Sequence, residues 1–295
     1  MVEPKRIDFR DQIAKNKWKS IFLIFCIFIV FLILGYVISM ATDPSYFFVI
    51  MILSIIISIL YILISYYNSD KIALASVRAK EASRTQYKQY YDLVEGLTLA
   101  SGLPMPRLYI MDSPMINAFA SGRNPQKAVI CVTTGALEKL DKKELEGVLA
   151  HELGHVANYD IRYMTLAAVM VGMIAIISEI FLRSLWFKSS DSDNKGNVIF
   201  LIIGIALAIL APIIVQLVQF AISRKREYSA DATSVAFTRH PQGLIGALKK
   251  IQKDNVPPEK KVSKAVAPLF FANPFRNLGS THPPLEDRIK ALERM

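Results

Sequence analysis

The sequence is poor in cysteine, with two such residues in a chain of 295. Cys26 and Cys131 show no paired spacing, which argues against a disulfide framework and against a metal site built on thiolates. This scarcity suits a reducing compartment such as the cytoplasm. Histidine is also scarce, with four residues in the whole chain. Two histidines that fall close together therefore need an explanation.

Charge is absent from two long stretches near the N-terminus. No charged residue lies between Lys19 and Asp43, or between Asp43 and Asp70. The apolar runs inside them, Ile21–Ala41 and Tyr46–Tyr67, are each long enough to cross a bilayer as a helix. The first run is too long for a cleaved signal peptide and lacks an obvious small-residue cleavage site. We therefore expect a membrane-anchoring hairpin.

Two further apolar segments follow, at about Tyr163–Leu182 and Val198–Ile222. Polar and helix-breaking residues such as Glu179 and Pro212 interrupt them, so they are either tilted spans or embedded helices that line a polar cavity. With 53% hydrophobic residues and a mean hydropathy of +0.33, the chain is too apolar for an ordinary soluble enzyme. We expect an α-helical membrane protein with a small β-sheet and about four transmembrane or membrane-embedded helices.

Basic residues set the expected orientation of these spans. Lys and Arg are frequent in the N-terminal arm and absent from the turn after the first span, which places the N-terminus in the cytoplasm. The basic run Arg224–Arg226 fits the same side, whereas the loop that carries Arg183, Lys188 and Lys195 does not. The expected protein is a multi-pass protein of the inner cell membrane, with its active site and both termini in the cytoplasm.

The chemistry is concentrated in a predicted helix that starts at Asp141, where Glu144 completes the pattern of a capping box. His151 and His155 lie one turn apart on one face, so both imidazoles reach one metal ion, with Glu152 beside them. In this H-E-x-x-H arrangement the histidines bind zinc, and the glutamate takes a proton from the water that attacks the substrate. Glu152 is therefore predicted as the catalytic base and not as a ligand.

A catalytic zinc site takes a third protein ligand. Glu227 and Asp231 lie four residues apart, and so share one face of a helix. We expect Glu227 to bind the metal and Asp231 to accept the free ring N–H of a ligating histidine. The alternative is an ordinary charged helix start after Arg224–Arg226. The predicted cofactor is one Zn2+ per chain.

These two segments, His151–His155 and Glu227–Asp231, resemble the HtpX family of bacterial membrane zinc metalloproteases, which are relatives of the CAAX prenyl proteases. The resemblance covers nearly the whole chain. It implies a zincin-like metalloprotease domain and an endopeptidase whose substrates are misfolded or damaged membrane proteins, in a stress response. Three other functions compete with this one: an intramembrane protease, a CAAX-type prenyl protein peptidase, and a non-enzymatic membrane scaffold.

Charges just before the metal motif disfavour the intramembrane site, and prenyl peptidases generally have more spans. The intact residues of the predicted site disfavour the scaffold. Within the small β part, strands are expected at Arg107–Met111 and Ala128–Thr133. The chain divides into an arm with the hairpin, a first protease half, two further membrane segments and a second protease half, at residues 1–70, 71–162, 163–222 and 223–295.

Two more segments match the family pattern. The sequence Asn117–Ala120 resembles the edge strand that holds an extended peptide, so Asn117 and Ala118 are expected to bind substrate, with a plain structural strand as the alternative. Near the C-terminus, His282 is the candidate donor to the oxyanion of the transition state, and Arg288 would support that charge. His282 can instead bind zinc in the resting enzyme, or belong to a simple turn before a short helix.

The net charge of +10 raises the question of nucleic acid as a partner. The basic residues flank apolar segments and do not form a patch with interleaved aromatic residues, so no nucleic acid is expected. The expected partners are membrane protein or peptide substrates and the lipid bilayer, whose anionic headgroups would meet the basic residues.

Overall fold

The computed structural model of the chain describes residues 9–41, 44–168, 224–254, 269–272 and 283–295. Most of the two later apolar segments falls on residues 169–222, outside the described residues, and so does His282. The start of the first of these segments is described: residues 163–168 are helical and buried. The two membrane segments predicted near the N-terminus are described almost in full.

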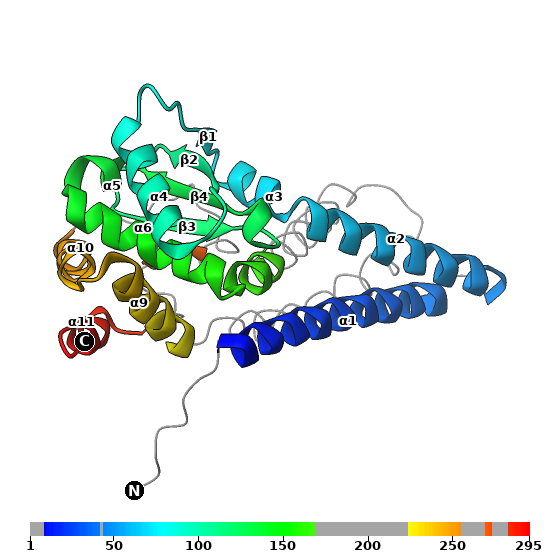
Figure 1. Ribbon diagram of the computed structural model, residues 1–295. Helices are drawn as coiled ribbons and strands as arrows, with labels where there is room; N and C mark the ends of the chain where they lie inside the picture. The colour runs from blue at the N-terminus through cyan, green and yellow to red at the C-terminus, as the bar shows by residue number, and fades with distance from the viewer. Residues whose placement is uncertain (1–8, 42–43, 169–223, 255–268, 273–282) are drawn as a thin grey trace, which may run out of the picture.

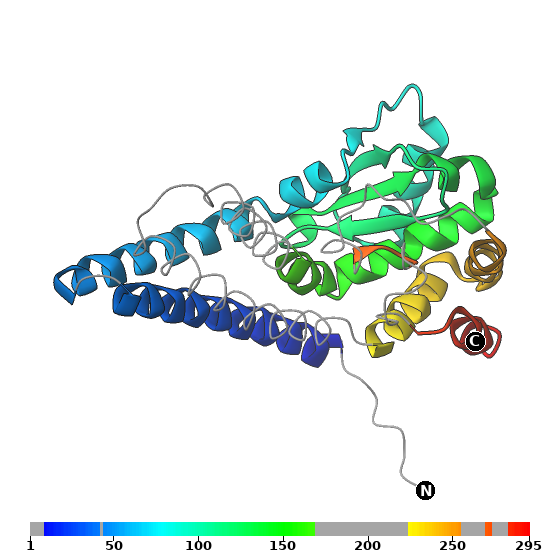
Figure 2. The same cartoon turned by 180° about the vertical axis from the view of Figure 1, so that it is seen from behind.

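These two segments form a helical hairpin, α1 (Phe9–Ala41) and α2 (Phe47–Tyr67), joined through the short 3-10 helix η1 (Pro44–Tyr46). Both helices are long and apolar enough to cross a bilayer. They lie side by side and extend away from the rest of the structure (Figures 1 and 2). Large apolar side chains are exposed along both, Phe48 at 76%, as expected for helices whose solvent is lipid.

The hairpin is held by close packing of small residues. A Cβ placed on Gly35 would lie 2.0 Å from the Oγ atom of Ser54 in the facing helix, so the glycine lets the two backbones approach. α1 also begins well before the predicted span at Ile21. Its first turns are therefore available for contacts outside the apolar part of the helix.

The small sheet follows the hairpin and has the strand order β1-β2-β4-β3. β2 and β4 pair in parallel, whereas β1 and β3 pair antiparallel to them, so β3 lies at one edge. The predicted strand at 107–111 is confirmed, and the second one begins one residue later than predicted. The elements of this part are α3 (Ser69–Ser76), β1 (Lys80–Glu81), α4 (Lys88–Ser101), β2 (Arg107–Met111), β3 (Ala118–Ser121), η2 (Pro125–Lys127), β4 (Val129–Thr133) and α5 (Thr134–Lys139).

Both faces of the sheet are covered, and every residue of β4 is buried. Successive side chains of a strand point to opposite faces. Ile130 therefore packs with α4 and with helix α6 (Lys142–Ala157), whereas Cys131 packs against α3 and the helical residues 164–168. Sheets with both faces covered have strands with continuous apolar sequence, as β4 has.

α6 is the central helix of the protease part, and its N-terminus has the predicted capping box. Asp141 accepts hydrogen bonds from the backbone N–H groups of Lys143 and Glu144, and the Glu144 carboxylate accepts one from the N–H of Asp141. From there α6 runs under the sheet, with α9 (Arg224–Thr238), α10 (Gln242–Lys253) and α11 (Leu285–Leu292) on its far side (Figure 1).

Two glycines of α6 bring its neighbours within backbone distance. A Cβ at Gly147 would lie 2.5 Å from the backbone nitrogen of Leu244 in α10, and one at Gly154 would lie 3.2 Å from the carbonyl oxygen of Ala230 in α9. Gly154 lies next to His155 in α6 and faces α9, the helix that carries Glu227 and Asp231. The close approach of α9 at this point brings the acids to the histidines.

Candidate metal centre

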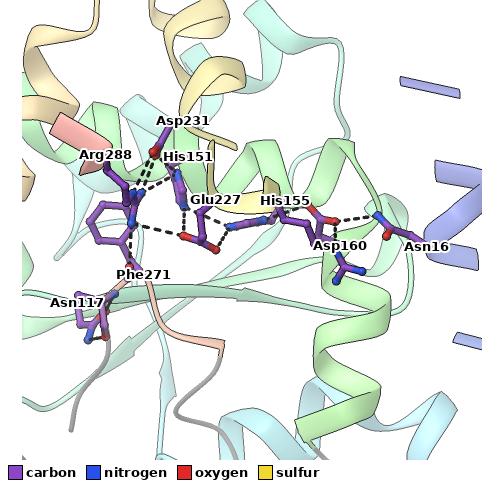
Figure 3. A network of polar contacts seen from close by, with 11 residues as sticks. Asn16, Asn117, His151, His155, Asp160, Glu227, Asp231, Phe271 and Arg288 are labelled. Carbon is purple, nitrogen blue, oxygen red and sulfur yellow. Dashed lines mark hydrogen bonds and ion pairs between the residues drawn. The ribbon is translucent and has the colours of Figure 1, made fainter. Parts of the chain in front are cut away.

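His151, His155 and Glu227 converge in the buried space between α6 and α9 (Figure 3). The Nε2 atoms of the two histidines lie 3.2 Å apart. The Glu227 carboxylate lies 3.6 Å from Nε2 of His151 through one oxygen and 3.5 Å from Nε2 of His155 through the other. The structure thus brings together the three predicted ligands, from two helices that are far apart in the sequence.

The spacing of these atoms fits a metal ion. Zinc binds nitrogen and oxygen ligands at about 2.0–2.1 Å in tetrahedral geometry, which separates any two ligand atoms by about 3.3 Å. The separation of the two histidine nitrogens and the distance from each of them to its nearer Glu227 oxygen lie close to that value, and one ligand atom from each residue can be chosen so that all three lie within 4.8 Å of one another. Two imidazoles and one carboxylate form a donor set that catalytic zinc uses. The residues present therefore fit the group, and three protein ligands leave a fourth position for water or substrate.

Glu152 lies next to this cluster and is 1% exposed. By distance and angle, neither of its carboxylate oxygens forms a hydrogen bond among the described residues, although the backbone of Ala120 is near enough to act on its pKa in the lowering direction. A buried carboxylate without partners is costly and needs a reason, such as a catalytic role. Burial raises the pKa of Glu152 above the ordinary value for a glutamate. This is the environment expected for a group that takes and returns a proton near neutral pH.

His151 is supported by a buried ion pair behind it. Its Nδ1 atom lies 2.8 Å from Asp231, so the carboxylate can accept the ring N–H and leave Nε2 free for a metal. Arg288 donates to both oxygens of Asp231, from Nε at 2.9 Å and from Nη2 at 2.6 Å. Burial opposes a charged carboxylate, but the charges of Arg288 and His151 lower the pKa of Asp231 below its ordinary value.

Arg288 is a buried cation beside the acids of the site. It is fully buried, its guanidinium also lies 3.4 Å from Glu227, and it donates to the carbonyl oxygen of Phe271 at 3.3 Å. Its donors are thus turned to the acids of the site and the backbone. These contacts make Arg288 a support of Asp231. The predicted role of Arg288 beside the reacting oxygen stays a prediction. The proposed donor to that oxygen, His282, lies outside the described residues.

His155 has a different support, which the sequence analysis did not find. Its Nδ1 atom lies 3.2 Å from one oxygen of Asp160, and the other oxygen accepts a hydrogen bond from the side chain of Asn16 at 2.8 Å (Figure 3). Burial alone would lower the pKa of His155, but the hydrogen bond to Asp160 and the charge of Glu227 raise it to about 9. Asp160 follows α6 after a turn in which Tyr159 has a left-handed backbone, with φ of 58°.

Asn117 and Ala118 lie at the edge of the sheet as predicted, but another part of the chain contacts them. The backbone N–H of Phe271 donates to the Ala118 carbonyl at 2.8 Å. The Asn117 side chain donates to the carbonyl of Ala272 at 2.8 Å and accepts from its N–H at 3.1 Å. These groups already make the hydrogen bonds that an added peptide strand would make. Their role in substrate binding stays a prediction.

Comparison with known proteins decides the family. Residues 84–295 match the sequence profile of Peptidase family M48. The chain belongs to this family. It is therefore a metallopeptidase, a hydrolase of peptide bonds, and the family implies a metal ion at the centre described above. The resemblance first noted from His151–His155 and Glu227–Asp231 is confirmed.

Relatives named "Protease HtpX homolog" match almost the whole chain. The protein from Dictyoglomus thermophilum is 41% identical over 99% of this chain and 96% of its own length. The protein from Thermoanaerobacter pseudethanolicus is 45% identical over 80% of this chain and 82% of its own length. Among solved structures, the crystal structure of S. mikatae Ste24p matches with 20% identity and a TM-score of 0.49, over 96% of this chain and 66% of that one.

Proposed function

We propose that the protein is a membrane-bound zinc endopeptidase, with one Zn2+ per chain, that cuts membrane proteins or peptides at the cytoplasmic face of the inner membrane. One observation carries this proposal: the buried atoms of His151, His155 and Glu227 have the spacing of tetrahedral ligands, and the unpartnered carboxylate of Glu152 lies beside them. A role in quality control of misfolded membrane proteins follows the resemblance to the HtpX family.

The residues divide the reaction among them. When bound, zinc supplies Lewis-acid polarisation of the peptide carbonyl and makes a water molecule acidic. Glu152 takes a proton from the water molecule while the oxygen of that water bonds to the carbonyl carbon of the substrate. Glu152 then gives a proton to the amine nitrogen as the C–N bond breaks. The raised pKa of Glu152 suits this transfer, because the group can hold the proton between the two steps. Asp231 and Asp160 accept the N–H groups at Nδ1 of His151 and His155, which leaves the two Nε2 atoms unprotonated and able to bind the metal.

The membrane part of the proposal rests on the hairpin of α1 and α2 and on the names of the relatives. The orientation rests on the basic residues of the N-terminal arm and of the run that starts at Arg224. The relatives are HtpX proteases, which favours a general membrane protease over a CAAX-type prenyl peptidase. Membership of a peptidase family disfavours the non-enzymatic scaffold.

Two variants test the assigned roles. Glu152→Gln should keep zinc and lose activity on an unfolded protein substrate, because the ligands remain while the base is gone. Glu227→Ala should lose affinity for zinc itself. Metal analysis of the purified proteins and a peptidase assay measure both. An absence of zinc in the Glu152 variant, or full zinc and activity in the Glu227 variant, would reverse the assignment.

The orientation has its own test. Cysteines introduced at the N-terminus, at Lys142 and at Arg224 should be shielded from an impermeant thiol reagent added outside the cell. A cysteine at Pro44, in the turn of the hairpin, should react. Labelling at Arg224 from outside would contradict a cytoplasmic active site, since Glu227 lies in the same helix.

A further inference from the structure

Between residues 16 and 20 of α1, three side chains are exposed and two are buried. Lys17, Trp18 and Lys19 are exposed, Trp18 at 71%, whereas Asn16 and Ser20 are 3% and 0% exposed. These two residues are one turn apart and so share one face of the helix. A buried amide in an otherwise solvated turn is informative, because polar groups are buried where they are hydrogen-bonded.

Asn16 binds the segment that follows the metal motif. Its Nδ2 atom donates to Asp160 at 2.8 Å and to the carbonyl oxygen of Asn158 at 3.1 Å, and both contacts are buried. The oxygen of Asp160 not used by Asn16 lies 3.2 Å from Nδ1 of His155. A continuous chain of contacts therefore leads from the membrane hairpin to a metal ligand, as Figure 3 shows.

Asn16 is the main donor that the hairpin gives to Asp160. A cation also lies near this carboxylate: the Nε atom of Arg226 is 3.5 Å from the same oxygen, a longer contact than the 2.8 Å hydrogen bond of Asn16. Asp160 is fully buried, so a lost donor is not replaced by bulk water. Without Asn16 the carboxylate would lose its shortest hydrogen bond and keep the longer contact with Arg226, so the ring of His155 would be oriented less firmly.

We propose that Asn16 is a positioning residue of the metal centre, through which the membrane hairpin completes the support of His155. The metal site is then fully formed only while α1 is docked against residues 158–160. This inference rests on the proposed zinc site, and it adds that the membrane anchor tunes the affinity of that site for metal.

The test is metal binding by the full-length protein in detergent. Asn16→Ala should weaken zinc binding by about 10–100-fold in competition with a chelator, which is the usual effect of losing such a supporting contact. It should also change the visible absorption spectrum of the Co2+-loaded protein and lower kcat more than it raises KM. Asn68→Ala is the matched control: the side-chain amide of Asn68, just after the end of α2, donates to the nearby carbonyl of Ile64, and among the described residues it makes no hydrogen bond to the metal site. This variant should leave all three measurements unchanged.

A double-mutant cycle separates positioning from general loss of structure. If Asn16 acts through Asp160, then Asn16→Ala should weaken zinc binding no further in a protein that already carries Asp160→Ala. Additive losses, or wild-type zinc affinity and an unchanged Co2+ spectrum in Asn16→Ala, would overturn the proposal. Failure of the wild-type protein to bind zinc at all would instead refute the proposed function.

A second site lies at the end of α2, where a cleft of about 390 Å³ opens beside the sheet. Its lining carries four basic residues and one acid, and the acid, Asp70, is paired with Arg107. The guanidinium of Arg123 lies 4.7 Å from the ring centroid of Tyr67, the last residue of α2. The remaining basic residues are Lys71 and Lys127.

Among the described residues, no acid is paired with Lys71, Arg123 or Lys127. The cleft also begins at Tyr67, where the apolar part of the hairpin ends and where aromatic residues commonly mark the membrane interface. A phospholipid beside α2 would carry its phosphate at this level. We infer that the cleft binds the phosphate of an anionic phospholipid headgroup, for which basic pockets at the membrane surface are suited.

Retention of phosphatidylglycerol, measured by native mass spectrometry of the purified protein, tests this site. The double variant Arg123→Gln/Lys127→Gln should weaken retention by about fivefold for each charge removed, while phosphatidylcholine is unaffected. The control Lys88→Gln/Lys142→Gln removes two charges from a separate cleft between α4 and α6 and should change nothing. Equal losses in both variants, or displacement of the lipid by millimolar inorganic phosphate, would overturn the assignment to a lipid.

Discussion

His151 and His155 lie one turn apart on α6, and each has a buried carboxylate at its Nδ1 atom, but the two carboxylates are held in different ways. Asp231 lies 2.8 Å from His151 and accepts two hydrogen bonds from the guanidinium of Arg288. Asp160 lies 3.2 Å from His155. The first pair belongs to the C-terminal half of the protease part, whereas the second is completed from the membrane hairpin.

The difference is one of charge and of origin. Asp231 has a fully buried cation as its partner, and this cation lowers its pKa. When a metal holds the His155 ring in its neutral form, Asp160 has the neutral amide of Asn16 as its nearest partner. It makes one longer contact, of 3.5 Å, with the buried guanidinium of Arg226. A buried ion pair is strongly destabilising to break, because the remaining charge is left without compensation, whereas a neutral hydrogen bond is worth much less. We therefore expect Asp231 and Arg288, behind His151, to contribute mainly to the stability of the fold. We expect Asp160 and Asn16, behind His155, to act mainly on the affinity for zinc.

The largest effect should come from removing the cation of the His151 side. Arg288→Met should lower the free energy of unfolding by about 3–5 kcal/mol, since Asp231 and Glu227 lose a buried positive charge. Thermal unfolding in detergent and zinc analysis measure the result. Arg294→Ala is the control, because this exposed residue lies just beyond α11. A stable Arg288 variant with full zinc content would contradict the view that Arg288 and Asp231 contribute more to stability than Asn16 and Asp160 do.

The next effect compares the two acids directly. Asp231→Ala and Asp160→Ala should each weaken zinc binding by about 10–100-fold, as loss of a carboxylate behind a ligating histidine usually does. Asp231→Ala should lower the thermal stability more than Asp160→Ala, because Asp231 holds Arg288 through two short hydrogen bonds, whereas Asp160 makes a single contact of 3.5 Å with the buried Arg226. Chelator competition and unfolding curves on the two proteins give the comparison. If both variants lose the same amount of thermal stability, then Asp231 with Arg288 and Asp160 with Asn16 contribute equally to the stability of the fold.

The cluster of His151, His155 and Glu227 could be predicted from the sequence because its members follow local rules. The spacing of His151 and His155 is one helical turn, and the capping box fixes where α6 begins. Glu227 and Asp231 were found by the same rule on a second helix. Asn16 was not found, because its partner lies 144 residues away and no local pattern links them.

Other parts of the fold were missed for similar reasons. Asp160 gave a weak signal, an acid shortly after the motif, whose use depends on the left-handed turn at Tyr159. The covering of Asn117 and Ala118 by Phe271 and Ala272 is also a long-range pairing. The β-branched and apolar character of the sequence predicted β2 and β4 but not β1, because two residues are too few to show such a character.

The third effect is on pH. The pKa of His155 is raised to about 9, so in the metal-free protein this ring carries a proton at neutral pH. Zinc must displace that proton, because only the neutral ring is a ligand. Zinc affinity should therefore fall by about tenfold for each pH unit below 9, with a proton released on binding at pH 7. Calorimetry in two buffers of different ionisation enthalpy measures the release, and it should decrease in Asp160→Asn, where a cause of the raised pKa is gone. Equal release in both proteins would contradict this account.

The smallest effect on zinc affinity should come from a change at the contact between α6 and α9 at Gly154, which affects the positions of both histidines relative to Glu227. A Cβ at Gly154 would lie 3.2 Å from the carbonyl oxygen of Ala230 and from Cβ of Thr233, so Gly154→Ala pushes α9 away from α6 by a few tenths of an ångström. Overpacking of this kind costs about 1–3 kcal/mol. Because Glu227 moves relative to both histidines, zinc affinity should fall only a few-fold, and the Co2+ spectrum should keep the shape it has in the wild type. A spectrum like that of Asn16→Ala would mean that the His155 side responds to any shift of α9, and that its dependence on the membrane hairpin is not specific.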